Sequence, residues 1–154
     1  MCDRDRFTRW FANPVAKLKE LPNGDGGFAA LMIALPLYER FLAARLEMTG
    51  GPARKQAIRG EMAKDLCLTR QQVEMFLKVF RHGFMHRGMG QPKEANWMTS
   101  CEFTAKPEFR VYDGKTCICL DPWKFADRVL KEFFNCPSLI DGCKDSPLAR
   151  IFPI

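Results

Sequence analysis

Residues 69–88 read TRQQVEMFLKVFRHGFMHRG, and this stretch decides what kind of fold the chain adopts. Thr69 is a good helix N-cap, and Gln72 three residues later completes a capping-box pattern. Apolar residues then recur at helical spacing: Val73, Phe76, Leu77, Phe80 and Phe84. The pattern predicts a helix from Arg70 to about His86 with this apolar stripe facing the core.

The end of that helix carries the only two histidines of the chain, His82 and His86, next to Arg81 and Arg87. Histidine gives or takes a proton near neutral pH, and arginine is a permanent cation whose planar fork suits phosphate. These side chains are therefore the candidates for acid–base chemistry on a phosphodiester without a metal: Arg81, His82 and His86 as catalytic groups, and Arg87 as a phosphate ligand.

Helix geometry adds a second expectation for this segment. The two histidines lie about 40° apart on an ideal helix, roughly opposite the apolar stripe, and Met75 and Val79 fall on the same outer face. This face could pack against another part of the chain or against the same helix of a second subunit. Arg81 lies about 140° from His86, so a two-fold pair of helices would bring the two groups to one phosphate more easily than one helix.

The remaining patterns predict a single, mainly α domain over residues 1–154. Its helical part covers about 7–88, and Pro36 should kink or split the apolar helix expected over 28–48. Short strands over 96–103, 109–112 and 116–120, with a turn at Asp113-Gly114, predict a small antiparallel sheet within about 96–120. A capping helix follows over about 121–135, because Asp121 and Pro122 are typical of a helix start. The tail covers 138–154.

Composition sets limits on function. The formal net charge of +6 is compatible with an anionic partner and equally with an ordinary basic protein. No run reaches the ~20 apolar residues of a bilayer-spanning helix, and the charged first six residues are not a signal peptide. We therefore expect a cytoplasmic location without a membrane partner.

Seven cysteines give an odd count and no zinc-finger spacing. Cys117 and Cys119 would point to the same face of a strand. We interpret most cysteines as small, buried, reduced residues, and we expect no metal and no cofactor.

The segment from Arg81 to His86 resembles the Arg-x4-6-His signature of HEPN (higher eukaryotes and prokaryotes nucleotide-binding) domains, with His82 as the polar residue after the arginine. The resemblance covers about 28–88. It implies a helical bundle that dimerises with its two motifs facing a shared cleft. Active members are metal-independent endoribonucleases, which leave 2′,3′-cyclic phosphate ends when the ribose 2′-hydroxyl attacks. Other members only bind RNA or a partner protein, such as an antitoxin, and many belong to toxin–antitoxin or phage-defence systems.

Other interpretations of the same residues stay open. His82 and His86 could be a zinc pair, although no nearby ligand set completes it, or simply polar residues that favour a helix C-terminus. Glu39 could orient a histidine or lie on a solvated helix face. The cations of the helix expected over 53–66 form a possible RNA-backbone surface or, again, a solvated face: Arg54, Lys55, Arg59 and Lys64.

Overall fold

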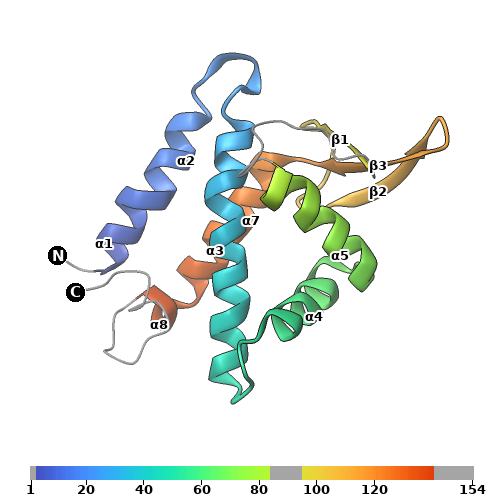
Figure 1. The fold of residues 1–154 in the computed structure, drawn as a ribbon. Helices are drawn as coiled ribbons and strands as arrows, with labels where there is room; N and C mark the ends of the chain where they lie inside the picture. Colours follow the sequence, from blue (N-terminus) through green and yellow to red (C-terminus); the bar gives the residue numbers. More distant parts are fainter. Residues whose placement is uncertain (1–2, 84–94, 141–154) are drawn as a thin grey trace.

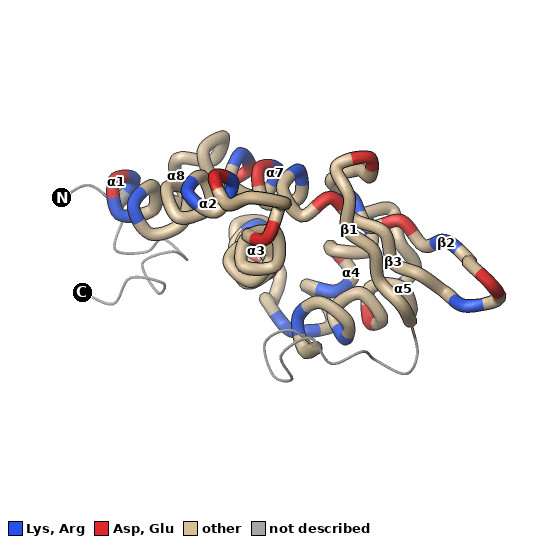
Figure 2. The backbone as a smooth tube through the Cα atoms, turned by 90° about the horizontal axis from the view of Figure 1, so that it is seen from above, with Lys and Arg blue, Asp and Glu red and all other residues tan. Residues whose placement is uncertain are grey.

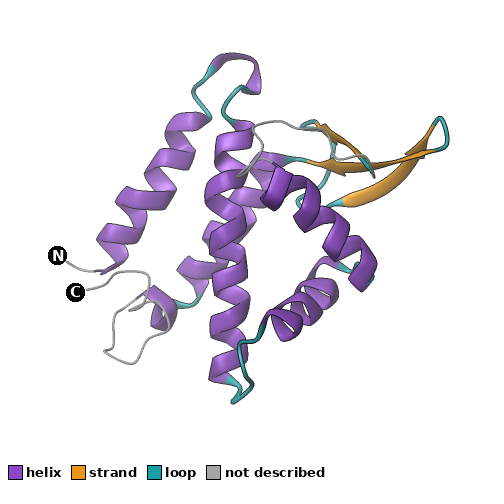
Figure 3. Ribbon diagram, viewed as in Figure 1, coloured by secondary structure: helices purple, strands orange, loops and turns teal. Residues whose placement is uncertain are grey.

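The computed structural model describes residues 3–83 and 95–140, and helices dominate it (Figures 1 and 3). The helical elements are α1 (Asp3–Phe7), the π-helix η1 (Thr8–Ala12), α2 (Asn13–Leu18), the 3₁₀ turn η2 (Pro22–Gly24), α3 (Gly27–Met48), α4 (Lys55–Leu66), α5 (Arg70–Phe76), the π-helix η3 (Leu77–Gly83), α7 (Pro122–Asn135) and α8 (Pro137–Ile140). The strands are β1 (Asn96–Thr99), β2 (Glu108–Tyr112) and β3 (Lys115–Leu120). The prediction of a mainly helical chain with a small sheet and a following helix is confirmed.

Helix α3 is the centre of the molecule. It packs along α7 and also contacts α2, α4 and η3. Seen down α3 in Figure 2, α1, α2 and α8 lie to one side, and α4, α5 and the sheet lie to the other. Of the two effects expected at Pro36, a kink or a split, the split is wrong, because the helix continues through this residue. Packing on several sides stabilises the helix enough to tolerate the lost backbone hydrogen bond.

By length and composition alone, α3 could also cross a bilayer, because an 18-residue window has a mean hydropathy of 1.4. However, 61% of that window is buried inside the fold. That degree of burial is what the core helix of a soluble protein shows, so a soluble protein is plausible.

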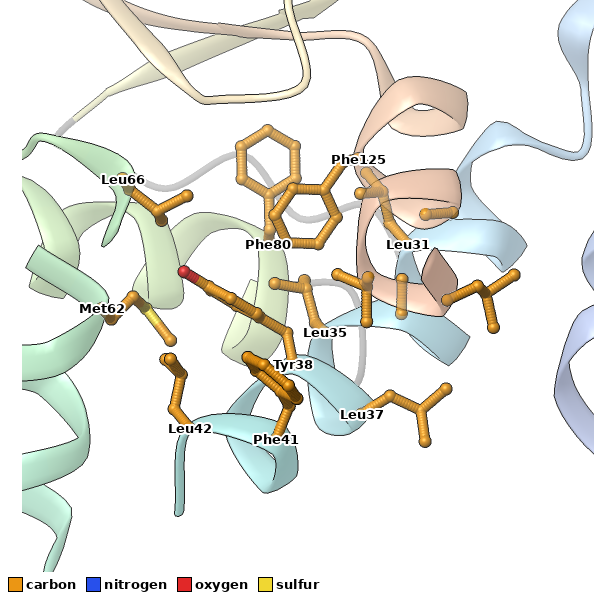
Figure 4. Close-up of a cluster of buried hydrophobic side chains, with 14 of the residues drawn as sticks. Leu31, Leu35, Leu37, Tyr38, Phe41, Leu42, Met62, Leu66, Phe80 and Phe125 are labelled. Atoms are coloured by element: carbon orange, nitrogen blue, oxygen red, sulfur yellow. The ribbon is translucent and has the colours of Figure 1, made fainter. Parts of the chain in front are cut away.

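The main core fills the space between α3, α4, α5, η3 and α7. The stripe predicted for the motif helix is buried at Val73, Phe76, Leu77 and Phe80, whereas Phe84 lies outside the described residues. Figure 4 shows Phe80 and Phe125 beside Leu35 and Tyr38 of α3.

Val79 does not behave as the ideal helical wheel predicts. It is 2% exposed and belongs to the main core, and Met75 is partly buried against the same core. The prediction of an outer apolar face that includes Val79 is therefore wrong. From Leu77 the chain winds as a π-helix, which fits more residues into each turn and so changes the directions that an α-helical wheel assigns.

The sheet has the strand order β1-β3-β2. The hairpin between β2 and β3 is confirmed, and its turn residues Asp113 and Gly114 have φ values of 49° and 72°. The first strand, however, pairs with β3 in parallel, so the prediction of a purely antiparallel sheet is wrong. The tight turn places β2 on one edge of β3, so β1 pairs with the other edge. The chain reverses direction once between β1 and β2 and again between β2 and β3. As a result, β1 and β3 run in the same direction.

Strand β3 is buried on both faces at its carboxyl end. Ile118 and Leu120 face the main core, and Cys117 and Cys119 pack with Phe103 on the opposite face. This confirms that the two cysteines share one face. The cysteines within the described part of the chain are free thiols: Cys67, Cys101, Cys117, Cys119 and Cys136.

Candidate functional site

The capping box that starts α5 is formed as predicted. The Thr69 hydroxyl accepts a hydrogen bond from the Gln72 backbone N–H at 3.2 Å, and the Gln72 side chain accepts one from the Thr69 N–H at 2.9 Å. The helix then changes from α to π winding at Leu77. Short π segments inside helices are rare and often occur at functional sites. Here the π segment holds Arg81 and His82.

Both of these residues line a cavity of about 380 Å³ between α3, α4 and η3. Its walls combine three apolar side chains with five polar or charged ones: Ile58, Met62 and Leu77, and Glu39, Lys55, Arg59, Arg81 and His82. The structure therefore brings Arg81 and His82 to one place. His86 and Arg87, the other two predicted site residues, lie outside the described residues.

An ion pair fixes the position of Arg81. Its Nε donates a hydrogen bond of 2.7 Å to Oε2 of Glu39 on α3, and the two side chains are 36% and 23% exposed. The terminal nitrogens of the guanidinium carry further donors that can contact an anion in the cavity. The idea that Glu39 lies near the motif helix is correct, but its hydrogen-bond partner is Arg81.

Helix α4 supplies the remaining cations of the cavity. Arg59 is largely buried and forms an ion pair with Glu74 of α5. Lys55 is exposed and has no ion-pair partner among the residues that the structure describes. The sequence indicated the basic character of α4, but only the packing of α4 against α3 and η3 shows which of its cations face Arg81.

A second polar cluster was not apparent from the sequence. The Tyr38 hydroxyl of α3 donates to the Asp65 carboxylate of α4, which also accepts from the Arg128 guanidinium of α7. Arg128 also lies over the Tyr38 ring, with its Cζ 5.8 Å from the ring centroid. In Figure 4 the hydroxyl end of Tyr38 points toward Met62 and Leu66 of α4.

The cluster shifts the ionisation of its members. Burial and the hydrogen bond to Asp65 raise the pKa of Tyr38 above its usual range. Burial also acts to raise the pKa of Asp65, but the hydrogen bonds from Tyr38 and Arg128 outweigh it, so this pKa is lowered. Asp65 is thus a carboxylate held charged by two donors, and it ties three helices together.

Within the ranges 3–83 and 95–140, no group of three His, Cys, Asp or Glu side chains is placed to hold a metal ion. Comparison of the chain with protein-family models, with curated proteins and with solved structures gives no match. The functional argument therefore rests on the residues of the cavity themselves.

Proposed function

We propose that the chain is a metal-independent endoribonuclease that acts at the cavity of Arg81 and His82. The observation that carries the proposal is the convergence of an ion-paired arginine, an imidazole and the cations Lys55 and Arg59 on one cavity. Such a set suits a phosphodiester, because the cations attract and hold its charge while the imidazole exchanges protons at neutral pH.

The proposed chemistry uses the internal nucleophile of RNA. The ribose 2′-hydroxyl loses its proton to a histidine and attacks the adjacent phosphorus, and the bond from phosphorus to the 5′-oxygen breaks as that oxygen receives a proton from a second acid. Arg81 stabilises the negative charge that develops on the phosphorane. The products carry a 2′,3′-cyclic phosphate and a free 5′-hydroxyl.

Two histidines are available for the two proton transfers. The HEPN resemblance makes His86 the principal proton-transfer group, and His82, which lies at the cavity, either orients the site or provides the second proton transfer. The same resemblance implies a homodimer with a composite site. The burial of Val79 removes part of the surface argument for such a dimer, so the dimer now rests on the resemblance. Light scattering at micromolar concentration should give twice the chain mass if the dimer forms.

A second candidate function is a non-catalytic module that binds RNA or a partner protein such as an antitoxin. The pairing of Arg81 with Glu39 favours it, because a guanidinium that is already neutralised in part gives less stabilisation to a developing charge. On either function, a role in a toxin–antitoxin or phage-defence system follows from the resemblance.

The test is incubation of a single-stranded RNA pool with the purified protein in EDTA, followed by analysis of the product ends. We expect cleavage with 2′,3′-cyclic phosphate ends and no cleavage of DNA, which lacks the 2′-hydroxyl. His82→Ala and His86→Ala should each lower the rate by about 10²–10⁴-fold.

Lys131→Ala is the control, because Lys131 is an exposed residue of α7 that does not line the cavity. RNA that stays intact at high protein concentration, but binds, would favour the non-catalytic module. Equal cleavage by all variants would indicate a contaminating nuclease and would contradict the proposal.

A further inference from the structure

The cavity of Arg81 and His82 has two chemically different halves. Its charged residues come from α3, α4 and η3, while Ile58, which is only partly buried, supplies the apolar surface that a ligand can contact. Met62 and Leu77 line the same side of the cavity but are 0% and 2% exposed, so this apolar side is rigid. A site for phosphate alone would gain nothing from this surface.

We propose that the cavity holds one unstacked nucleotide of single-stranded RNA, with its base against the apolar half and its phosphate at Arg81 and Lys55. This inference rests on the proposed function and adds a base subsite to it. A nucleotide has the required combination, because its base is flat and largely apolar on its faces while its phosphate is a strong anion.

The volume of the cavity agrees with a single nucleotide. A volume of about 380 Å³ is near the lower end of the range of about 300–1,000 Å³ that is usual for small-ligand pockets. A base can enter such a space only when it is splayed out from its neighbours, which is how single-stranded RNA is generally recognised. Paired RNA keeps its bases stacked and should be excluded.

Other ligand classes fit the cavity less well. A purely apolar ligand would take the Arg81–Glu39 ion pair and Lys55 out of water without any compensating charge. A small inorganic anion would leave the apolar wall in contact with water. The nucleotide satisfies both halves at once, because its phosphate meets the guanidinium of Arg81, which Glu39 holds in place, while its base covers the apolar side.

The experiment compares three probes of increasing size: inorganic phosphate, ribose 5-phosphate and the four nucleoside 5′-monophosphates. Their dissociation constants are measured by NMR titration of the ¹⁵N-labelled full chain. We expect the nucleotides to bind at least about tenfold more tightly than ribose 5-phosphate, which is the usual contribution of one stacked base. The nucleotides should shift the amide signals of Ile58 and Leu77, whereas phosphate should shift mainly those near Arg81.

A pair of variants tests the base subsite directly. Ile58→Ala should weaken nucleotide binding and leave ribose 5-phosphate binding unchanged, because Ile58 faces the cavity but carries no charge. Ile33→Ala is the matched control, since Ile33 is also partly buried but lines a different groove, with Trp10 and Pro36. Circular dichroism confirms that each variant is folded.

The outcomes separate this inference from the proposed function. If nucleotides, ribose 5-phosphate and phosphate bind with equal affinity at Arg81, the base subsite is overturned and the anion site remains. If no probe shifts any signal of the cavity and RNA is neither bound nor cut, both the inference and the proposed function fail. A selective loss in Ile58→Ala supports the base subsite, whereas the proposed function is decided by RNA cleavage.

Discussion

Two consecutive residues of α3, Tyr38 and Glu39, belong to two different polar clusters. One cluster lies between three helices, and the other lies at the edge of a cavity. Tyr38 joins Asp65 and Arg128 between α3, α4 and α7, where the side chains of Asp65 and Arg128 are only 20% and 21% exposed. Glu39 joins Arg81 at the edge of a cavity, where the arginine side chain is 36% exposed. Both clusters pair an arginine with a carboxylate.

The difference teaches how to separate a structural ion pair from a functional one. The part-buried Asp65 carboxylate receives two hydrogen bonds from side chains of two other helices, so its charge is used in holding helices together. The Arg81 guanidinium donates through Nε to Glu39, and the residue lines the cavity. We therefore expect changes at Asp65 to affect mainly stability and changes at Arg81 to affect mainly RNA cleavage.

The largest effect should come from Asp65→Ala. Removing the carboxylate leaves the Arg128 charge and the Tyr38 hydroxyl without their acceptor inside the protein, which should lower the free energy of unfolding by about 3 kcal/mol. Urea denaturation followed by circular dichroism measures this loss. Asp127→Ala is the control, because the Lys19–Asp127 pair is much more exposed and should contribute less than about 1 kcal/mol. Equal losses in the two variants would contradict the structural role.

The next largest effect is expected at Arg81, where a substitution should lower activity and leave stability almost unchanged. Arg81→Ala should lower the rate of RNA cleavage by about 10²–10³-fold, because in the proposed mechanism Arg81 stabilises the developing phosphorane charge. Its free energy of unfolding should change by less than about 1 kcal/mol, since the ion pair with Glu39 is partly exposed to solvent.

Arg110→Ala provides the matched control for that change. Arg110 also pairs with a glutamate, Glu108, at 2.7 Å, but it lies on the hairpin and does not line the cavity. Cleavage by this variant should equal that of wild type. If Arg81→Ala instead unfolds the chain and keeps its activity per folded molecule, the assignment of the two clusters is reversed.

A smaller effect is expected in the pH dependence of stability. Because the folded state lowers the pKa of Asp65, its ionised form contributes stability above the unfolded value of about 4, and this contribution is lost as pH falls through the folded pKa. The stability difference between wild type and Asp65→Asn should therefore narrow as pH falls below about 4. The urea concentration at the midpoint of unfolding, determined for both proteins at several pH values, measures this difference in stability. A constant difference would show that Asp65 is not held as a carboxylate.

Local patterns predicted much of this molecule because their causes are local. The capping box at Thr69, the Asp113-Gly114 turn and the Asp121-Pro122 helix start each depend on a few adjacent residues, and all three are present. The same holds for the apolar stripe of α5, since helical spacing decides which side chains meet the core.

The features that sequence did not predict depend on contacts between distant elements. The parallel pairing of β1 with β3 depends on which edge of β3 remains free once β2 has paired with the other edge. The burial of Val79 depends on the change from α to π winding at Leu77. The cluster of Tyr38, Asp65 and Arg128 was not predicted, because only the approach of α7 brings Arg128 to the other two residues. For the candidate site, sequence predicted that Arg81 and His82 belong together, but not that Lys55 and Arg59 share their cavity.

The smallest expected effect tests how Glu39 acts on Arg81. Glu39→Gln keeps an amide oxygen that can accept the hydrogen bond from Arg81 Nε, but it removes one negative charge from the cavity. Adenosine 5′-monophosphate should then bind about two- to fivefold more tightly at low ionic strength, with the gain fading as salt screens the added charge. NMR titration at two salt concentrations measures this change, and Glu108→Gln on the hairpin is the matched control.

Glu39→Ala should lose the gain, because without an acceptor on α3 the arginine is no longer held toward the cavity. Weaker binding in Glu39→Gln, at any salt concentration, would mean that the negative charge of Glu39 is itself needed by the ligand and that Arg81 is not the principal phosphate contact.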